Sequence, residues 1–550
     1  MTDFLSPQHL IIAPILIPMI AGAVMLLYDD RQRRAKLVLG LLSSISLLLV
    51  AIELVARSKG SPMTGHNAIG LYLLGDWPTP ISIVLVLDRL SAMMLVMVAL
   101  LAIPALVYSA AGWHRQGQHF HSLFQFLLMG LNGAFLTGDL FNLFVFFEVL
   151  LAASYGLLLH GSGQLRVRAG LHYIAINLVA SLMFLIGVSL IYGVTGTLNM
   201  ADLAAKIGAL SPEDRPLFHG AAAILGLAFL VKAGIWPLSF WLPTAYMAGA
   251  APVAAMFAIM TKVGVYVILR TSMLVFGVTA GASQGFGGDV LMFGGMATIA
   301  FGLLGVLASQ GLGRIAAHLV LVSSGTVIAV TGFSLLGGGT VMLGGALYYM
   351  LSSTLAISAL FLLVEPMSRE EGGIASMLAL TADAYGVNLP EEEAKSEVGL
   401  TIPAAMTVLG LSFIICVLLL AGLPPLSGFV GKFAMLTGAL NPAGLGRGEI
   451  TWPVWTFMAL LFVSGFATLL GLVRIGIQTF WASEGAPPRV FALEMGPILG
   501  LIALTVVMTI QAQPVMRYMD ATARALNNPK IYIEGVIHAH RIADQTEDEE

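Results

Sequence analysis

Long apolar runs with almost no charge recur along the whole chain, and they restrict its fold more than any other feature. Of the 550 residues, 58% are hydrophobic and only 10% are charged, whereas a typical soluble domain carries about 25% charged residues. A water-soluble chain of this size needs more polar residues to cover its surface. In lipid, a helix satisfies its own backbone groups, so the composition predicts an all-α integral membrane protein.

Runs of roughly 20 apolar residues, the length that spans a bilayer's hydrocarbon core, predict about fourteen transmembrane helices. The first run follows an acidic residue and lacks a clear cleavage site, so we interpret it as a retained helix and not a signal peptide. The predicted ranges are 9–28, 37–56, 84–110, 121–138, 140–160, 169–194, 218–246, 252–274, 288–308, 315–336, 340–365, 402–438, 454–480 and 491–512.

Basic residues in short loops predict the orientation of the chain. The segment 29–36 holds four of them and is therefore expected on the cytoplasmic side, which places both termini outside. Arg57 and Lys59 fall on the opposite side, so the rule holds imperfectly. The polar segments 366–400 and 515–550 are expected to be solvated surface or docking sites for partners.

Several classes of function are disfavoured by residue content. The net charge of −4 argues against nucleic-acid binding, which needs a basic face. The single Cys416 allows neither an intramolecular disulfide nor a thiolate metal site. His114, His119 and His121 match no standard zinc spacing and are expected in a solvated loop. No complete nucleotide motif is present, so we expect no cofactor, no metal and no enzymatic site.

Two of the predicted helices are interrupted by prolines. The sequence VKAGIWPLSFWLP at 231–243 and the sequence AGLPPLSGFVGKF at 421–433 each carry two of them. Proline removes a backbone donor and breaks or kinks a helix, and a pair of broken helices in two halves indicates the ion path of a transporter. Prolines also occur in membrane helices for packing reasons. A lysine beside each break, Lys232 and Lys432, favours function.

Four charged residues lie where charges are costly, namely Glu148, Lys232, Lys262 and Lys432. A charge at mid-bilayer costs about 2.5–3.5 kcal/mol on insertion scales, and such residues mark ion or proton routes. The alternative for a lysine is snorkelling to the interface. Glu148 and Lys262 lie about eight and ten residues from the starts of their predicted helices, too deep for that alternative.

The chemistry of these groups suits proton relay. Burial disfavours the charged form of a lysine or a glutamate, whereas a nearby opposite charge favours it. His318 titrates near neutral pH and is a candidate bridge between lysines, although an interfacial structural histidine fits its position almost as well. Asp139 is expected to cap the N-terminus of a helix, with a gate as the less favoured interpretation.

Taken together, these segments resemble the antiporter-like membrane subunits shared by multisubunit Na⁺/H⁺ antiporters and respiratory complex I. The resemblance rests on NLFVFFEVL with Glu148, on the stretch 231–264 with Lys232 and Lys262, and on LPPLSGFVGKF with Lys432. It covers roughly residues 80–480. Within that superfamily the chain is most similar to the family of D-type subunits of Mrp-type (Mnh) monovalent cation/H⁺ antiporters.

The resemblance implies two inverted five-helix repeats, the fourth to eighth and the ninth to thirteenth predicted helices, and a central polar axis. Glu148 would pair with Lys232, Lys262 would continue the axis, and Lys432 would end it. Members act with other subunits in a hetero-oligomer, in the inner (plasma) membrane of a bacterium. The implied divisions are residues 1–112, 113–280, 281–482 with the loop 366–400, and 483–550.

One departure concerns the eleventh predicted helix, where relatives often carry a histidine and this chain has Ser352 and Ser353. Hydroxyls hold water but do not titrate near neutral pH, so this part of the route would rely on water and His318. The main alternative function is a proton-pumping subunit of an NADH dehydrogenase or a membrane hydrogenase. A lipid-modifying enzyme and a passive scaffold are weaker rivals, since neither explains Glu148 and the lysines.

Overall fold

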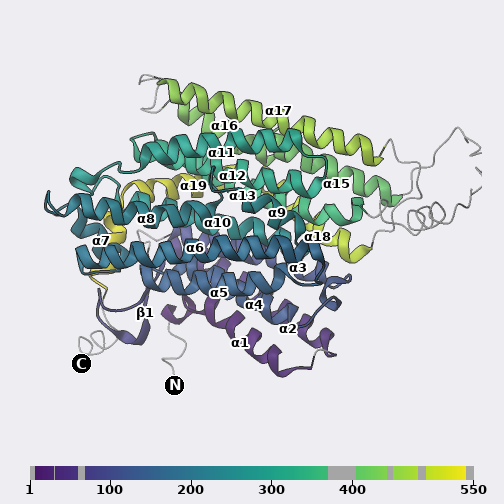
Figure 1. Ribbon diagram of the computed structural model, residues 1–550, viewed down its shortest axis with the longest axis horizontal. Helices are drawn as coiled ribbons and strands as arrows, with labels where there is room; N and C mark the ends of the chain where they lie inside the picture. Colours follow the sequence, from purple (N-terminus) through teal and green to yellow (C-terminus); the bar gives the residue numbers. More distant parts are fainter. Residues whose placement is uncertain are drawn as a thin grey trace, which may run out of the picture.

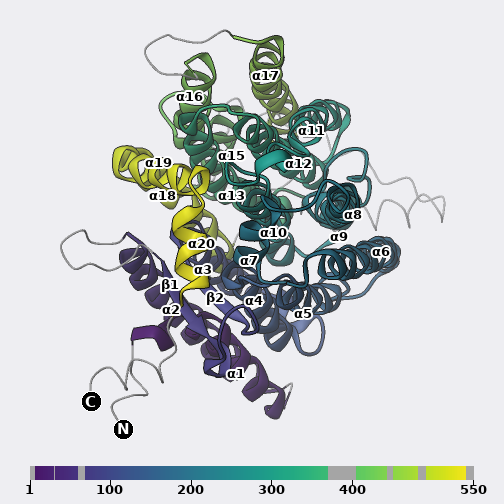
Figure 2. The same cartoon turned by 90° about the vertical axis from the view of Figure 1, so that its left-hand side faces the viewer.

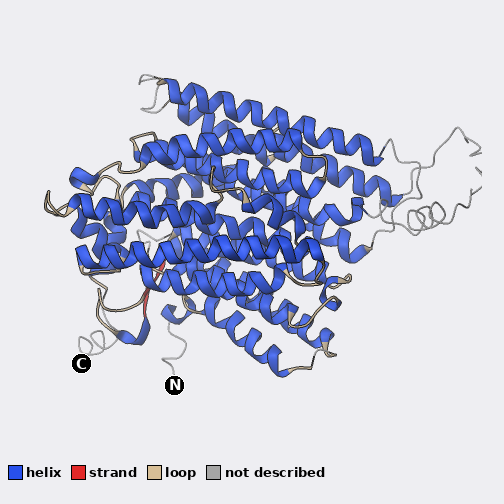
Figure 3. Ribbon diagram, viewed as in Figure 1, coloured by secondary structure: helices blue, strands red, loops and turns tan. Residues whose placement is uncertain are grey.

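The chain is almost entirely helical in the computed structural model, which describes residues 7–29, 31–59, 69–368, 404–441, 450–480 and 491–539. Figure 3 shows one exception, a small antiparallel hairpin of β1 (Gly70–Leu73) and β2 (Val84–Leu87). The predicted helical membrane fold is confirmed, while the hairpin was not expected from the sequence.

The helices follow one another with short connections. The first half contains α1 (Ala13–Leu27), α2 (Arg33–Ser58), α3 (Arg89–Ser109), α4 (Phe120–Leu136), α5 (Leu140–Leu158), α6 (Gln164–Thr195), α7 (Met200–Ile207), α8 (Arg215–Ala233), α9 (Trp241–Ala248) and α10 (Ala251–Val275). The second half contains α11 (Gly288–Ala308), α12 (Leu312–Leu335), α13 (Thr340–Ser368), α15 (Ala404–Ala421), α16 (Ser427–Leu440), α17 (Trp452–Phe480), α18 (Ala492–Ile510), α19 (Ala512–Asn527) and α20 (Lys530–Ile537).

Each of the fourteen predicted ranges overlaps a helix in the structure, or two helices where a break was expected. Among the described residues, eleven helices are long and apolar enough to cross a membrane, and α1, α4 and α15 are shorter apolar helices. The chain is therefore a multi-pass membrane protein. The count of fourteen spans stays a prediction.

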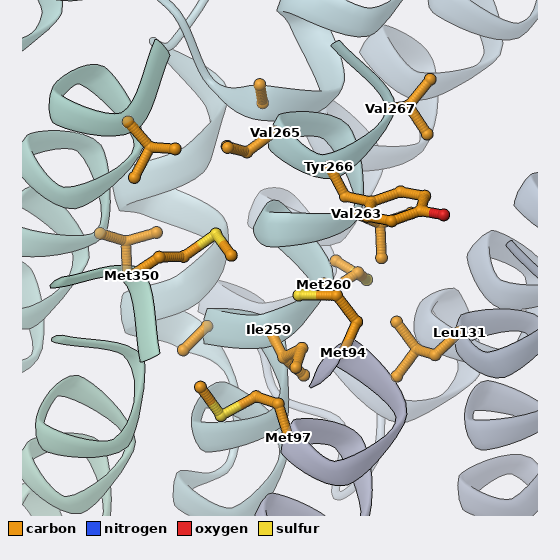
Figure 4. Close-up of a cluster of buried hydrophobic side chains, with 14 of the residues drawn as sticks. Met94, Met97, Leu131, Ile259, Met260, Val263, Val265, Tyr266, Val267 and Met350 are labelled. Atoms are coloured by element: carbon orange, nitrogen blue, oxygen red, sulfur yellow. The ribbon is translucent and has the colours of Figure 1, made fainter. Parts of the chain in front are cut away.

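The long helices run roughly parallel to one another (Figure 1), and the view along them shows an elongated bundle (Figure 2). In Figure 2, α1, α2, α4 and α5 gather at one end of the bundle, α16 and α17 at the other, and α10 lies between. Every residue in the apolar window of α10 is buried, and α10 contacts α3, α8, α12 and α13. Figure 4 shows its packing with methionines of neighbouring helices, Met94, Met97 and Met350.

Both expected breaks are present. The first lies between α8 and α9, over Gly234–Phe240, and the second between α15 and α16, over Gly422–Leu426. Gly234 and Gly422 both have a positive φ, which only glycine adopts at little cost. Each broken helix stands fourth in its half of the chain if counting begins at α4 and at α11, in agreement with the repeat arrangement that the family resemblance implies.

The C-terminal segment differs from its expectation as solvated surface. Helices α19 and α20 form a strap that packs on α13 and α7, because α19 is amphipathic and buries Met519 and Leu526 on its apolar face. The hydroxyl of Tyr518 donates to the carbonyl of Arg89 at 2.8 Å. Residues 540–550, and residues 369–403 of the polar connection, lie outside the described residues.

A buried ion pair that sequence reasoning missed lies beside this strap. Arg270 of α10 makes two contacts with the carboxylate of Asp88, at 2.6 and 2.7 Å, and the ring of Tyr532 from α20 covers its guanidinium at 5.1 Å. Burial raises the pKa of Asp88, but the charge of Arg270 and its hydrogen bonds outweigh burial and leave that pKa below its usual value. The pair joins α3, α10 and α20.

We predict that Asp88→Ala destabilises the protein strongly, because it leaves Arg270 buried without its partner. Breaking a buried pair from one side costs about 3–5 kcal/mol. The measurement is the thermal midpoint of the detergent-solubilised protein, followed by size-exclusion chromatography after heating. The control is Glu53→Ala, which breaks the exposed pair with Arg57 and should change little. Equal midpoints for the two variants would contradict the prediction.

Candidate functional site

The charged residues singled out in the sequence lie inside the helical bundle. Lys262 is 1% exposed, Lys232 is 7% exposed and Lys432 is 8% exposed, while Glu148 is partly buried. They come from α10, α8, α16 and α5 respectively. Snorkelling is therefore wrong for the three lysines, since their ammonium groups find partners within the protein.

Glu148 and Lys232 are joined through the hydroxyl of Ser181 on α6. That hydroxyl donates to Glu148 Oε1 at 2.5 Å and accepts from Lys232 Nζ at 3.5 Å. Lys232 also donates to Asn177 Oδ1 at 3.2 Å. The family resemblance implied a direct pair, and the structure instead shows a bridged one. A bridge keeps the two charges apart while leaving a hydrogen-bonded path between them.

Lys262 lies among hydroxyl groups. Its Nζ donates to Ser323 Oγ at 2.8 Å and to Ser324 Oγ at 3.0 Å, both on α12. The Ser323 hydroxyl in turn lies 2.8 Å from that of Ser353 on α13. These serines satisfy the ammonium group that α10 buries, and they extend its hydrogen bonds into the second half of the bundle.

A close contact holds together the two helices that carry Lys232 and Lys262. A Cβ added at Gly264 would lie 2.6 Å from the backbone nitrogen of Ala233 and 2.9 Å from the carbonyl carbon of Lys232. Glycine is required at this point because any side chain would separate α8 from α10. The contact therefore fixes the spacing of the two helices beside both lysines.

The second break carries the remaining site residues. The Ser352 hydroxyl lies 2.7 Å from that of Ser427, the first residue of α16. Lys432 Nζ donates to the carbonyl oxygen of Ala421 at 2.9 Å and approaches that of Leu420 at 3.5 Å. Lys432 thus holds the C-terminal end of the broken helix α15, where cations are favoured.

His318 lies apart from the lysines. It is six residues beyond the start of α12, deeper than the sequence suggested, and 8% exposed. Its Nδ1 donates to the carbonyl of Arg314 at 2.8 Å, and its ring packs on Gly305. Among the described residues it forms no hydrogen bond with a lysine.

Two further expectations have outcomes. Asp139 caps α5, where its carboxylate accepts from the Asn142 amide at 2.8 Å, which confirms the capping role. The expectation of a solvated loop is wrong for His114 and His121, which are buried with their ring nitrogens 3.4 Å apart, and it holds for the exposed His119.

His114 stands outside the spanning helices, and burial, followed by the charges of Arg115 and Arg33, lowers its pKa. No group of acidic, histidine and cysteine side chains in the described part of the chain has the arrangement of a metal site.

Sequence reasoning missed the polar partners of the charges, namely Asn177, Ser181, Ser323, Ser324 and Ser427. A weak signal was available for two of them. Asn177 and Ser181 are four residues apart in an otherwise apolar helix, so they lie on one face. Single serines in apolar runs are too common in membrane helices to be chosen without the tertiary structure.

The fold and this line of buried charges define the class of protein, and comparisons with known proteins agree. Residues 137–445 match the family model described as NADH:quinone oxidoreductase/Mrp antiporter, TM. The chain therefore belongs to this family of membrane subunits. It is 55% identical to the D subunit of a probable K⁺/H⁺ antiporter of Rhizobium meliloti, over 99% of this chain and 100% of the relative.

Other relatives support the same group. The chain is 34% identical to the D subunit of a Na⁺/H⁺ antiporter of Alkalihalophilus pseudofirmus, over 96% of this chain and 99% of the relative. It superposes on a chain of the Mrp complex from Dietzia sp. with a TM-score of 0.79 and 26% identity, covering 97% of this chain and 100% of that one. A chain of complex I from Thermus thermophilus, at 22% identity and a TM-score of 0.72, covers 95% of this chain and 99% of that one and shows the shared fold alone. The resemblance to the D-type subunits is confirmed.

We predict that Gly264→Ala lowers the thermal stability of the protein, because the new Cβ forces α8 and α10 apart at Lys232. Overpacking of this kind costs about 1–3 kcal/mol. The control is Gly226→Ala in α8, where no atom lies within 4 Å of the added Cβ and alanine favours a helix. Thermal midpoints of the solubilised protein decide the matter, and a midpoint for Gly264→Ala at or above that of Gly226→Ala would sink the prediction.

Proposed function

We propose that this chain is the D-type subunit of a multisubunit monovalent cation/proton antiporter, and that Glu148, Lys232, Lys262 and Lys432 relay protons through it. The observation that carries the proposal is the row of buried ionisable groups and hydroxyls between the two broken helices. The chain itself catalyses no covalent chemistry in this proposal, and it uses no metal and no cofactor.

The cost of burying these groups supports the relay. Apolar side chains would pack α8, α10 and α16 without desolvating an ammonium group, and three lysines in such positions are costly. Each lysine is hydrogen-bonded to groups that are neutral. Neutral partners leave the charged and uncharged forms of a lysine closer in free energy than a firm ion pair would. A proton is therefore able to move on and off during turnover.

The hydrogen bonds give the relay an order. In the first half, a proton on Lys232 is one hydroxyl away from Glu148, through Ser181. Lys262 connects to the second half through Ser323 and Ser353. Ser352 and Ser427 then approach the second break, where Lys432 lies. Water in the polar core would join these segments, since hydroxyls hold water in place.

His318 enters the proposal as a side branch near the start of α12. Its Nδ1 is committed to the Arg314 carbonyl, which fixes the tautomer and leaves Nε2 to accept a proton. The serines of α12 and α13, and not this histidine, provide the hydrogen bonds of Lys262. They stand in for the histidine that the family resemblance implied in the eleventh helix.

We propose that the chain works beside other membrane subunits in a bacterial plasma membrane. The full-length relatives are named as subunits of K⁺/H⁺ and Na⁺/H⁺ antiporters, so the cation is monovalent. The sequence-based domain division, with repeats at 113–280 and 281–482, is retained as part of the proposal, because α8–α9 and α15–α16 break at matching places. A redox-driven proton pump is the alternative, supported only by structural likeness at 22% identity or less.

We predict that Glu148→Gln, Lys232→Ala and Lys432→Ala each abolish cation-dependent proton movement, because each removes a titrating group from the relay. The whole set of subunits is expressed in salt-sensitive cells lacking antiporters, and exchange is measured in everted vesicles with a pH-sensitive dye. The control is Lys206→Ala on α7, whose lysine pairs with Asp202 near the surface and should leave exchange intact. Assembly of each complex is checked by co-purification of the other subunits. Normal exchange by any of the three assembled variants would remove that residue from the relay.

We predict that Ser323→Ala slows exchange by about tenfold, because it deprives Lys262 of its hydroxyl link to Ser353. Leaving a buried donor without its partner costs about 1–3 kcal/mol, and 1.4 kcal/mol corresponds to a factor of ten. The matched control is Ser358→Ala on α13, whose hydroxyl donates only to the carbonyl of Ala255. Initial rates in the same vesicles compare the two, and equal rates would contradict the serine route.

A further inference from the structure

The second break leaves two particular carbonyl groups without their helical donors. In an α-helix, the carbonyl of one residue accepts from the amide four residues later. The partners of Leu420 O and Ala421 O would therefore be the nitrogens of residues 424 and 425. Both are prolines, which carry no N–H. The Pro424–Pro425 pair thus presents two adjacent oxygens in a buried part of the protein.

Lys432 occupies the position in front of these oxygens. Its Nζ lies 2.9 Å from Ala421 O and 3.5 Å from Leu420 O. Gly465 of α17 borders the same space, since an added Cβ there would lie 2.6 Å from Ala421 O and 3.2 Å from Lys432 Nζ. Among the described residues, Lys432 forms no ion pair. Backbone dipoles alone hold its charge.

The first break is built differently. Pro237 deprives the carbonyl of Ala233 of its donor, but Lys232 turns away from its own broken helix to Asn177 and Ser181 on α6. A lysine beside a proline break is therefore not enough to produce this arrangement. The double proline and the absence of a side chain at Gly465 make the second break a seat for a single positive charge.

The geometry points to a binding site for a monovalent cation on Leu420 O and Ala421 O, where the cation and the protonated Lys432 exclude each other. This inference rests on the proposed function and names the place where cation and proton compete. When one proton leaves Nζ to water, the two oxygens lose their positive partner. One cation then enters, so that the seat gains the charge that it lost.

The chemistry of the seat selects the kind of cation. Backbone carbonyls at the C-terminal end of a half-helix coordinate Na⁺ or K⁺ in transporters, and the negative end of the helix dipole favours a cation there. A potassium ion and an ammonium group are similar in size, whereas a sodium ion is smaller. Carbonyls spaced to hold an ammonium group therefore fit a potassium-sized ion better than a bare sodium ion.

Equilibrium binding of radiolabelled rubidium, a potassium surrogate, to the purified whole complex tests the inference. We expect Lys432→Ala to bind rubidium at least tenfold more tightly than the unmodified complex at neutral pH, because the competing ammonium group is gone. We expect Gly465→Ala to bind at least tenfold more weakly, because its methyl group fills the seat. The control is Gly410→Ala on α15, whose added Cβ would make only ordinary contacts, the nearest at 3.7 Å.

The outcomes separate the inference from the proposed function. Unchanged rubidium affinity in both Lys432→Ala and Gly465→Ala, in complexes that contain all subunits, overturns the cation site even if the unmodified complex exchanges cations normally. Failure of the unmodified complex to move protons in response to any monovalent cation overturns the proposed function instead. Sodium competing with rubidium more strongly than potassium does would overturn the size argument.

Discussion

The structure depends on one constraint, namely that no polar group inside a bilayer is left without a partner. Helices meet that constraint for the backbone, so almost every described element is a helix. Wherever the chain departs from a regular helix, another group replaces the missing bond. The amide of Trp236 in the first break donates to Thr298 Oγ1 at 2.9 Å, and the carbonyls of the second break accept from Lys432.

The same constraint explains why the buried charges come with small polar side chains. Each ammonium group needs acceptors, and serine and asparagine supply them without adding a charge. Lys262 meets two serines of α12, and Lys232 meets Asn177 and Ser181 of α6. Neutral acceptors satisfy a lysine without fixing its protonation state, which suits a route whose groups must titrate in turn. Firm ion pairing is found instead at Asp88 and Arg270, next to the C-terminal strap.

Close contacts between helices place these groups. Gly264 allows α8 to meet α10, and Gly465 allows α17 to reach the end of α15. At Gly295, a Cβ would lie 2.4 Å from the Ala329 nitrogen, so α11 and α12 touch through their backbones. Without side chains at these points, polar groups from different helices come within hydrogen-bond distance. The strap of α19 and α20 then ties the second half of the bundle to α3 and α7 through Tyr518 and α20.

The sequence by itself determined the membrane class, the positions of the helices, the two breaks and the buried charges, because length, apolarity and proline act locally along the chain. It also carried the family resemblance. Only the tertiary structure decided the partners. The Ser181 bridge, the Lys262 serines, the two carbonyls facing Lys432 and the burial of His114 and His121 join residues from different helices or turns. Such pairings depend on how helices face one another, and helical periodicity fixes a residue's face but not the helix that packs against it.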